Sequence, residues 1–82
     1  MDQSILESII QLFSEILDYP ASKINKDSSS DTIKNWDSLQ NINLVIAVEN
    51  KFKIKFKIEE IEGLNKIEDF SIFVEKKIND KK

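Results

Sequence analysis

The chain has 82 residues, a formal net charge of −3 and no Cys, His or Arg, so all of its positive side-chain charge comes from Lys. This length suits one domain, residues 1–82, with a modest hydrophobic core. The missing Cys and His exclude a thiol nucleophile, an imidazole base and the usual kind of zinc site. Without Arg, and with this acidic balance, the chain is also a poor candidate for nucleic-acid binding.

The composition favours a helical protein. One Gly and one Pro leave few tight turns, which argues for helices rather than a sheet of hairpins. The first residues lack the basic segment of a signal peptide, and no apolar run approaches the ~20 residues that cross a bilayer. We therefore expect a cytoplasmic monomer with no membrane span and no metal site.

The first predicted helix spans Ser4–Asp18 and ends before Pro20, because a residue that precedes Pro disfavours helical backbone. Its apolar residues recur three and four positions apart, as they do in a stripe that faces a core. The stripe consists of Ile5, Ile9, Leu12, Phe13 and Ile16, and is widened by Leu6, Ile10 and Leu17.

A long connection, Ala21–Trp36, follows this helix. Connections of this length without secondary structure are uncommon in compact domains and are often functional. We expect Ile24 and Ile33 to hold the connection against the core, and the serine run Ser28–Ser30 to be solvated.

The second predicted helix spans Ser38–Lys51, with Phe52 as its end. Its apolar residues again recur three and four positions apart. The side chains expected to point inward are those of Leu39, Leu44, Val45 and Val48.

Asp37 is the predicted N-cap of this helix, and Gln40, three residues on, is placed to complete a variant of the capping box. Ser38 then lies at the helix N-terminus. Unpaired backbone N–H groups and the positive end of the helix dipole favour a phosphate at such a position. Capping alone also explains an Asp-Ser pair, so the residues by themselves leave both interpretations open.

Residues 51–58 alternate Lys with apolar residues, the pattern of a half-buried strand. No second strand is evident in the sequence, and a lone strand would leave its backbone groups unpaired. We therefore predict an extended loop anchored by Ile54 and Phe56. Its lysines form a solvated face or, as the alternative, a basic docking patch.

A short third helix is predicted over Ile58–Leu64, with Gly63 or Asn65 at its end and Lys57 as a poor N-cap. The last helix is predicted over Ile67–Ile78, with Asn65 as its cap and fraying over residues 79–82. The side chains of Ile61 and Leu64 should face the core. The predicted fold is all-α: a small four-helix bundle with three main helices, a short third helix and a long loop between the first two.

Several segments carry a resemblance to a known family. They are Trp36–Leu39 with its Asp-Ser-Leu sequence, Leu44–Phe52, and then Ile54 and Phe56. Together with the two C-terminal helices, they resemble acyl carrier proteins over nearly the whole chain. The resemblance implies that Ser38, flanked by Asp37 and Leu39, carries a 4'-phosphopantetheine arm, which a phosphopantetheinyl transferase attaches from coenzyme A. The arm would hold an acyl or aminoacyl group as a thioester, and the protein itself would not be an enzyme.

The resemblance also implies that acyl-loading and acyl-transfer enzymes dock along the second helix. The residues that would meet them are Leu39, Ile42, Asn43, Ile46 and Glu49. A core position is the alternative for Ile42 and Ile46. Helix two departs from the common acidic pattern of the family, because Glu49 is its sole acidic residue. This departure favours a specialised lipid or secondary-metabolite pathway over housekeeping fatty acid biosynthesis.

Two other classes of function were weighed. One is an unmodified helical interaction module, such as an adaptor or an immunity-type bundle. The other is a small enzyme, which the carboxylates do not favour. The acidic pairs Glu59/Glu60 and Glu68/Asp69 are adjacent in sequence, so their side chains splay apart on a helix and form no acid–base couple.

Overall fold

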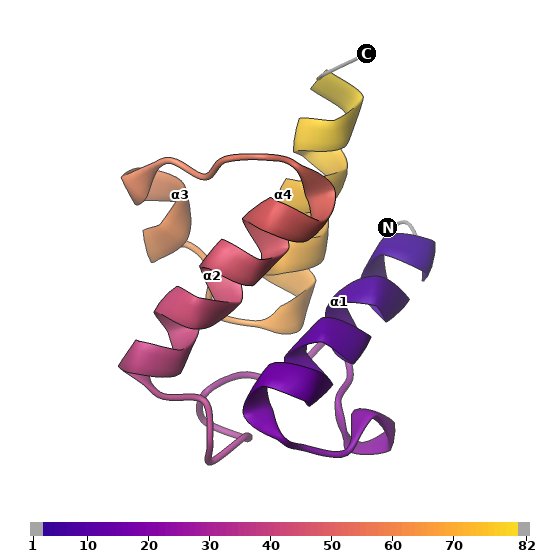
Figure 1. Ribbon diagram of the computed structural model, residues 1–82, viewed down its shortest axis with the longest axis vertical. Coiled ribbons are helices and arrows are strands. Elements are labelled where there is room, and N and C mark those ends of the chain that lie inside the picture. Colours follow the sequence, from indigo (N-terminus) through magenta and orange to yellow (C-terminus); the bar gives the residue numbers. More distant parts are fainter. Residues whose placement is uncertain (1–2, 81–82) are drawn as a thin grey trace.

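The computed structural model describes residues 3–80 and is helical, as predicted (Figure 1). The helices are α1 (Gln3–Leu17), α2 (Ser38–Phe52), α3 (Ile58–Glu62) and α4 (Ile67–Asp80), with a single 3₁₀ turn, η1 (Ala21–Lys23), after α1. Between residues 3 and 80 no strand forms, and the only β-type pairing is an isolated bridge between Ser29 and Lys66. α1 packs against both α2 and α4, and the short α3 joins the end of α2 to the start of α4.

The core is built around α1 and an aromatic cluster. Phe13 meets Trp36 edge-on with ring centroids 5.3 Å apart, and meets Phe70 in the same way at 4.9 Å. Such edge-to-face pairs add to the stabilisation that burial alone provides. Trp36 comes from the α1–α2 loop, so the residue two positions before Ser38 is part of the core. The α1 side chains buried with this cluster are Leu6, Ile9, Phe13 and Leu17.

The α1–α2 loop is held against the core as predicted, because Ile24 and Ile33 are both buried. The prediction of a solvated serine run is wrong for Ser28, which is buried. Its Oγ accepts a hydrogen bond from the Asn25 N–H at 3.0 Å, and its carbonyl accepts the Ile67 N–H at 3.0 Å. The loop carbonyl therefore satisfies a backbone donor at the start of α4, which water would otherwise have to solvate.

Two details of α4 differ from the prediction. Asn65 is not its cap: Oδ2 of Asp69 instead accepts the N–H groups of Asn65 and Lys66, at 2.9 and 3.1 Å. The helix also continues through Asn79 and Asp80, where fraying was expected, while residues 81 and 82 lie outside the described part of the chain.

The α2–α3 connection is an extended loop with buried anchors, as predicted. Ile54 is 3% exposed and Phe56 is 9% exposed. Oε2 of Glu49 accepts the Phe56 N–H at 2.8 Å, so a side chain supplies the acceptor that a neighbouring strand would have supplied. Lys53 ends α2 in the left-handed conformation, with φ of 56°.

Helix α3 is shorter than predicted and ends at Glu62. Gly63 has φ of −89°, so its freedom at positive φ is not used. Leu64 is buried and Ile61 is partly buried against the core, as expected. The poor cap, Lys57, is offset by Glu60, whose Oε1 accepts the Lys57 N–H at 2.7 Å and pairs with Nζ of Lys77 on α4 at 2.8 Å.

Candidate functional site

The start of α2 is fixed by Asp37. This residue has extended backbone, and its Oδ1 accepts the Gln40 N–H at 2.8 Å, which confirms the predicted N-cap. The reciprocal half of the capping box is not made. The side-chain oxygen of Gln40 instead accepts a hydrogen bond from Nδ2 of Asn43 at 3.0 Å, because it turns along the helix surface rather than back toward the cap.

Ser38 is the first residue of α2, and its side chain is exposed. The N–H groups of Ser38 and Leu39 have no protein acceptor among residues 3–80, whereas that of Gln40 is taken by Asp37. Two open donors and the positive end of the helix dipole thus lie beside the Ser38 hydroxyl. A phosphate ester on this oxygen would be electrostatically favoured and would need no desolvation of a buried group.

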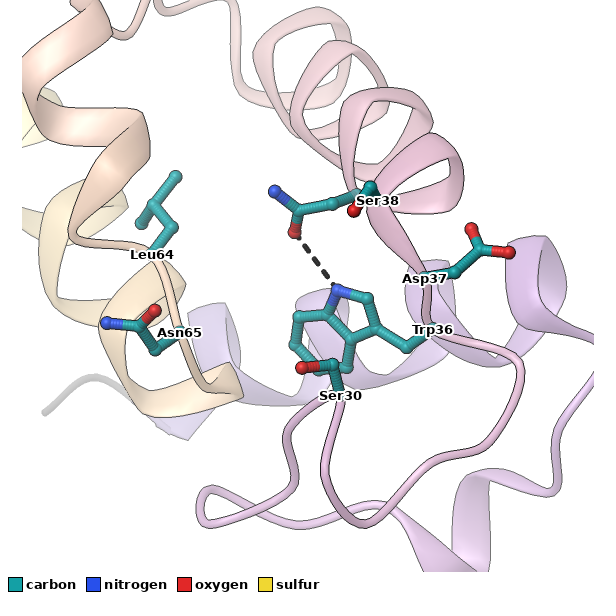
Figure 2. A pocket seen from close by; sticks show the side chains of 7 residues that line it. Ser30, Trp36, Asp37, Ser38, Leu64 and Asn65 are labelled. Atoms are coloured by element: carbon teal, nitrogen blue, oxygen red, sulfur yellow. Dashed lines mark hydrogen bonds between the residues drawn. The ribbon is translucent and has the colours of Figure 1, made fainter.

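A hollow of about 420 Å³ opens next to Ser38 (Figure 2). Leu64 and Asn65 form the wall opposite Ser38, and Ser30 and Trp36 lie between the two walls. The carboxylate of Asp37 points away from the hollow. The residues that line it are Ser30, Trp36, Asp37, Ser38, Asn41, Leu64 and Asn65.

The hollow is lined by hydrogen-bonding groups and by the indole of Trp36. Nε1 of Trp36 donates to Oδ1 of Asn41 at 3.0 Å, which fixes the indole beneath the opening. The hydroxyl of Ser30 and the amide of Asn65 are both exposed at its rim. A chain rich in amide groups, such as a pantetheine arm, fits a lining of this kind, since its N–H and C=O groups find partners there.

The outer face of α2 is apolar. Leu39 is 70% exposed, Ile42 57% and Ile46 49%. The prediction that Leu39 points inward is wrong, and so is the alternative that Ile42 and Ile46 belong to the core. The helix buries Leu44, Val45 and Val48 instead, and steps of 100° per residue place the three exposed residues on the opposite side.

The remaining two residues predicted to meet a partner differ in their surroundings. Asn43 is exposed, in line with a contact position. Glu49 is half-buried, and its carboxylate is occupied by the Phe56 N–H. The structure thus presents Leu39, Ile42, Asn43 and Ile46 on one face next to Ser38, and uses Glu49 to fasten the loop that follows.

Sequence reasoning missed most of the lining of the hollow. Asn41 lies nearly one turn after Ser38, so helical spacing was a usable signal for it. Ser30 and the Leu64–Asn65 segment are distant in sequence and reach the site only through the packing of the α1–α2 loop and of α3. Among residues 3–80, no group of three or more acidic, His or Cys residues is arranged to hold a metal ion. None of the helices in this range combines the length and the apolar character needed to span a membrane.

Comparison with known proteins finds relatives that carry the same name. The chain is 31% identical over 75 residues to an acyl carrier protein of Prochlorococcus marinus (strain MIT 9515), covering 92% of this chain and 94% of that protein. An acyl carrier protein of Buchnera aphidicola subsp. Acyrthosiphon pisum is 33% identical over 75 residues, with the same coverage of 92% and 94%. A scan against models of protein families finds no match.

The fold has a close solved counterpart. The solution NMR structure of a holo acyl carrier protein from Geobacter metallireducens matches it with a TM-score of 0.86 at 29% sequence identity, covering 96% of this chain and 91% of that one. Three observations point to the same family. The sequence is similar to these carriers along nearly its whole length, the all-helical fold is shared, and the Asp-Ser-Leu turn is exposed. The chain therefore belongs to the acyl carrier protein family, whose members carry acyl groups and are not themselves enzymes.

Proposed function

We propose that this protein carries an acyl or aminoacyl group on a 4'-phosphopantetheine arm attached to Oγ of Ser38, and that it presents this group to acyl-handling enzymes. The observation that carries the proposal is the exposed Ser38 hydroxyl at the head of α2, beside the open N–H groups of Ser38 and Leu39. The polar hollow next to it would accommodate part of the arm. Residues 1–82 would act as one carrier domain and as a monomer.

A phosphopantetheinyl transferase would catalyse the attachment. Oγ of Ser38 forms the new phosphodiester bond, the pyrophosphate bond of coenzyme A breaks, the hydroxyl proton leaves, and 3',5'-adenosine bisphosphate is released. The N-terminus of α2 stabilises the negative phosphodiester, and Asp37 keeps that terminus in place by capping it. Once attached, the arm supplies a thiol that holds the acyl group as a thioester, and tethering raises its effective concentration at each partner site.

Coenzyme A is the donor for this step, so we place the protein in the cytoplasm. Loading and transfer enzymes would dock on the apolar face formed by Leu39, Ile42 and Ile46, with Asn43 at its edge and Glu49 at its far end. The group that these enzymes load and remove would be an acyl or aminoacyl group, held as a thioester.

Mass spectrometry tests the attachment directly. The purified chain is incubated with coenzyme A and a broad-specificity phosphopantetheinyl transferase. We expect the mass of one arm to be gained by the wild-type chain and by Ser30→Ala, which changes another serine of the same hollow, but not by Ser38→Ala. An unmodified helical interaction module would gain no mass. Such a result, or a gain retained in Ser38→Ala, would contradict the proposal.

We further propose a specialised lipid or secondary-metabolite pathway. α2 has Glu49 as its only acidic residue, and this carboxylate is already bonded to the Phe56 N–H. Enzymes of fatty acid biosynthesis that are steered by an acidic carrier helix would therefore meet this one slowly. We expect poor loading by a malonyl transferase of such a system, and better loading after Gln40→Glu with Asn43→Glu. Efficient loading of the wild-type chain would contradict the specialised role.

A further inference from the structure

The last turn of α2 and the α2–α3 connection carry a dense positive charge. We define the lysine loop as residues 51–57, in which Lys51, Lys53, Lys55 and Lys57 alternate with apolar residues. These four of the chain's 12 basic residues fall within seven positions, although the net charge of the chain is −3. All four are exposed, while Ile54 and Phe56 between them are buried. The segment therefore exposes four lysines around two buried anchors.

The backbone beneath these lysines is fixed at several points. The Ile54 N–H donates to the Glu49 carbonyl at 3.1 Å, and the Phe56 N–H donates to the Glu49 carboxylate at 2.8 Å. The Phe56 ring meets the Phe73 ring of α4 edge-on, with centroids 6.4 Å apart. The charges thus rest on an anchored segment, so a partner that binds them has little backbone entropy to remove.

Three of the four loop lysines form no ion pair with the described part of the chain. Within residues 3–80, Lys51, Lys55 and Lys57 have no carboxylate at ion-pair distance. Two acidic residues near the loop bind other groups: Glu49 accepts the Phe56 N–H, and Glu60 accepts the Lys57 N–H and pairs with Lys77. Lys51, Lys55 and Lys57 are therefore available to pair with carboxylates of another protein.

The lysine loop lies at the C-terminal end of α2. The helix has 15 residues and is about 22 Å long, with Ser38 at one end and the loop at the other (Figure 1). The exposed side chains of Leu39, Ile42 and Ile46 lie along the intervening surface. A partner that receives the arm at one end of α2 can reach the loop at the other.

We propose that the lysine loop is a docking contact for a carboxylate-rich surface on an acyl-handling enzyme, an inference that rests on the proposed carrier function. In this arrangement the apolar face of α2 supplies the buried contact. The lysines supply charge complementarity, which accelerates encounter with the partner. At this contact the carrier supplies the positive charge and the enzyme supplies the negative charge.

The surroundings of the loop favour a protein partner over an anionic membrane. Glu59 and Glu62 are exposed immediately after the loop, and Glu7 and Glu15 of α1 share a hollow with Lys51. A uniformly negative bilayer surface would repel these carboxylates while it attracts the lysines. A protein surface can instead place its acidic residues opposite the loop alone.

Photo-crosslinking locates the partner surface. The apo chain contains no thiol, so Lys55→Cys can be labelled uniquely with a benzophenone maleimide before the arm is attached. The labelled holo carrier is irradiated in an extract of the cells that make it, and the joined peptides are sequenced. We expect peptides rich in Asp and Glu from an acyl-handling enzyme. The matched control is Lys66→Cys, an exposed site at the opposite end of α3. Equal yields from both sites, or joined peptides without acidic clusters, would overturn the proposal.

Kinetics with the enzyme so identified measures the contribution of the loop. One variant changes the four loop lysines to Gln. Its control changes four other exposed lysines to Gln, so that both lose the same charge: Lys23, Lys34, Lys66 and Lys76. We expect KM for the carrier to rise about tenfold for the loop variant at low salt and less than about twofold for the control, with kcat unchanged and the difference shrinking at high salt. Equal effects of the two variants would overturn the proposal.

Two further measurements separate this proposal from its rivals. Flotation with vesicles of phosphatidylcholine and phosphatidylglycerol should leave the wild-type chain unbound, and binding that the loop variant loses would assign the loop to a membrane instead. Attachment of the arm is followed by mass on every variant. Variants that gain the arm but show no loop-specific effect overturn the lysine-loop contact alone, whereas a wild-type chain that gains no arm contradicts the carrier function and this inference with it.

Discussion

The indole N–H of Trp36 donates a 3.0 Å hydrogen bond to Oδ1 of Asn41, and this bond ties the end of the α1–α2 loop to the first turns of α2. Trp36 is only 4% exposed, and its ring packs against Phe13 and Phe70. Ser38 lies between the two bonded residues in the chain. The segment that presents the serine is therefore fastened to the core on one side and to the helix on the other.

Removing the acceptor for Trp36 should weaken the fold. In Asn41→Ala the indole N–H loses its partner, and because this bond is only partly buried, the loss should cost about 0.5–1.5 kcal/mol of the free energy of unfolding. Asn41→Asp keeps an acceptor and should stay close to the wild type. Urea unfolding followed by circular dichroism measures the difference, and the fluorescence of the sole Trp reports on its surroundings. Wild-type stability in Asn41→Ala would show that the bond is dispensable.

The Asp37 cap should contribute measurably to α2. Asp37→Ala removes the acceptor of the Gln40 N–H, and the loss of an N-cap costs about 0.5–2 kcal/mol. Asp37→Asn retains a side-chain oxygen and should stay close to the wild type, because Asn and Asp are equally favourable N-caps. Chemical unfolding of both variants checks this order. If Asn and Ala prove equally destabilising at position 37, the negative charge rather than the hydrogen bond is what matters.

The Glu60 carboxyl makes the free energy of unfolding depend on pH in the acid range. Its pKa is lowered, chiefly by the hydrogen bond from the Lys57 N–H and then by the bond from the Lys77 ammonium. A lowered pKa means that the ionised form is favoured in the folded chain. Its contribution is therefore complete above the pKa of an unfolded glutamate, about 4.3, and is lost as the pH falls through the lower folded value.

Glu60→Gln should accordingly be less stable than the wild type at neutral pH and should approach it as the solution is acidified. Glu62→Gln, an exposed neighbour at the end of α3, serves as the control and should differ little at either pH. Free energies of unfolding measured at pH 7 and in strong acid give the comparison. A gap between wild type and Glu60→Gln that stays constant with pH would disprove this assignment.

The end of α1 offers a stabilising substitution. Asp18 adopts the left-handed conformation with φ of 51°, and its charge lies at the negative end of the helix dipole. Asp18→Gly relieves both costs and should raise the free energy of unfolding by about 0.5–1 kcal/mol. Glu15→Gly, on the exposed face within the helix, should lower it by about 1 kcal/mol. A loss of stability in Asp18→Gly would mean that this carboxylate has a favourable role at the turn.

Most of the helical framework was predictable because the apolar spacing of α1, α2 and α4 is strong. The burial of Ile24, Ile33 and Ile54 followed from their isolation among polar neighbours, since such residues have few other ways to leave water. The rotation of α2 was harder to predict. Both of its faces carry apolar residues, so spacing alone could not show that Leu39 lies outside and Leu44 inside.

Polar partners were the least predictable feature. Several residues can supply an acceptor near each helix start, and the choice depends on where the chain passes in space. Thus Asp69 rather than Asn65 accepts the N–H groups before α4. Ser28, which was predicted to be solvated because it lies in a serine run, is buried, and its carbonyl accepts the Ile67 N–H.

The sequence by itself determined the helices, the capped turn that begins α2 and the Asp-Ser-Leu motif within it, because these depend on residues a few positions apart. Only the tertiary structure decided which face of α2 is left for a partner, which distant residues surround Ser38, and which groups bind the carboxylates of Glu49 and Glu60. Those outcomes depend on packing between segments remote in the chain, where the burial of one side chain removes or supplies the neighbours of another.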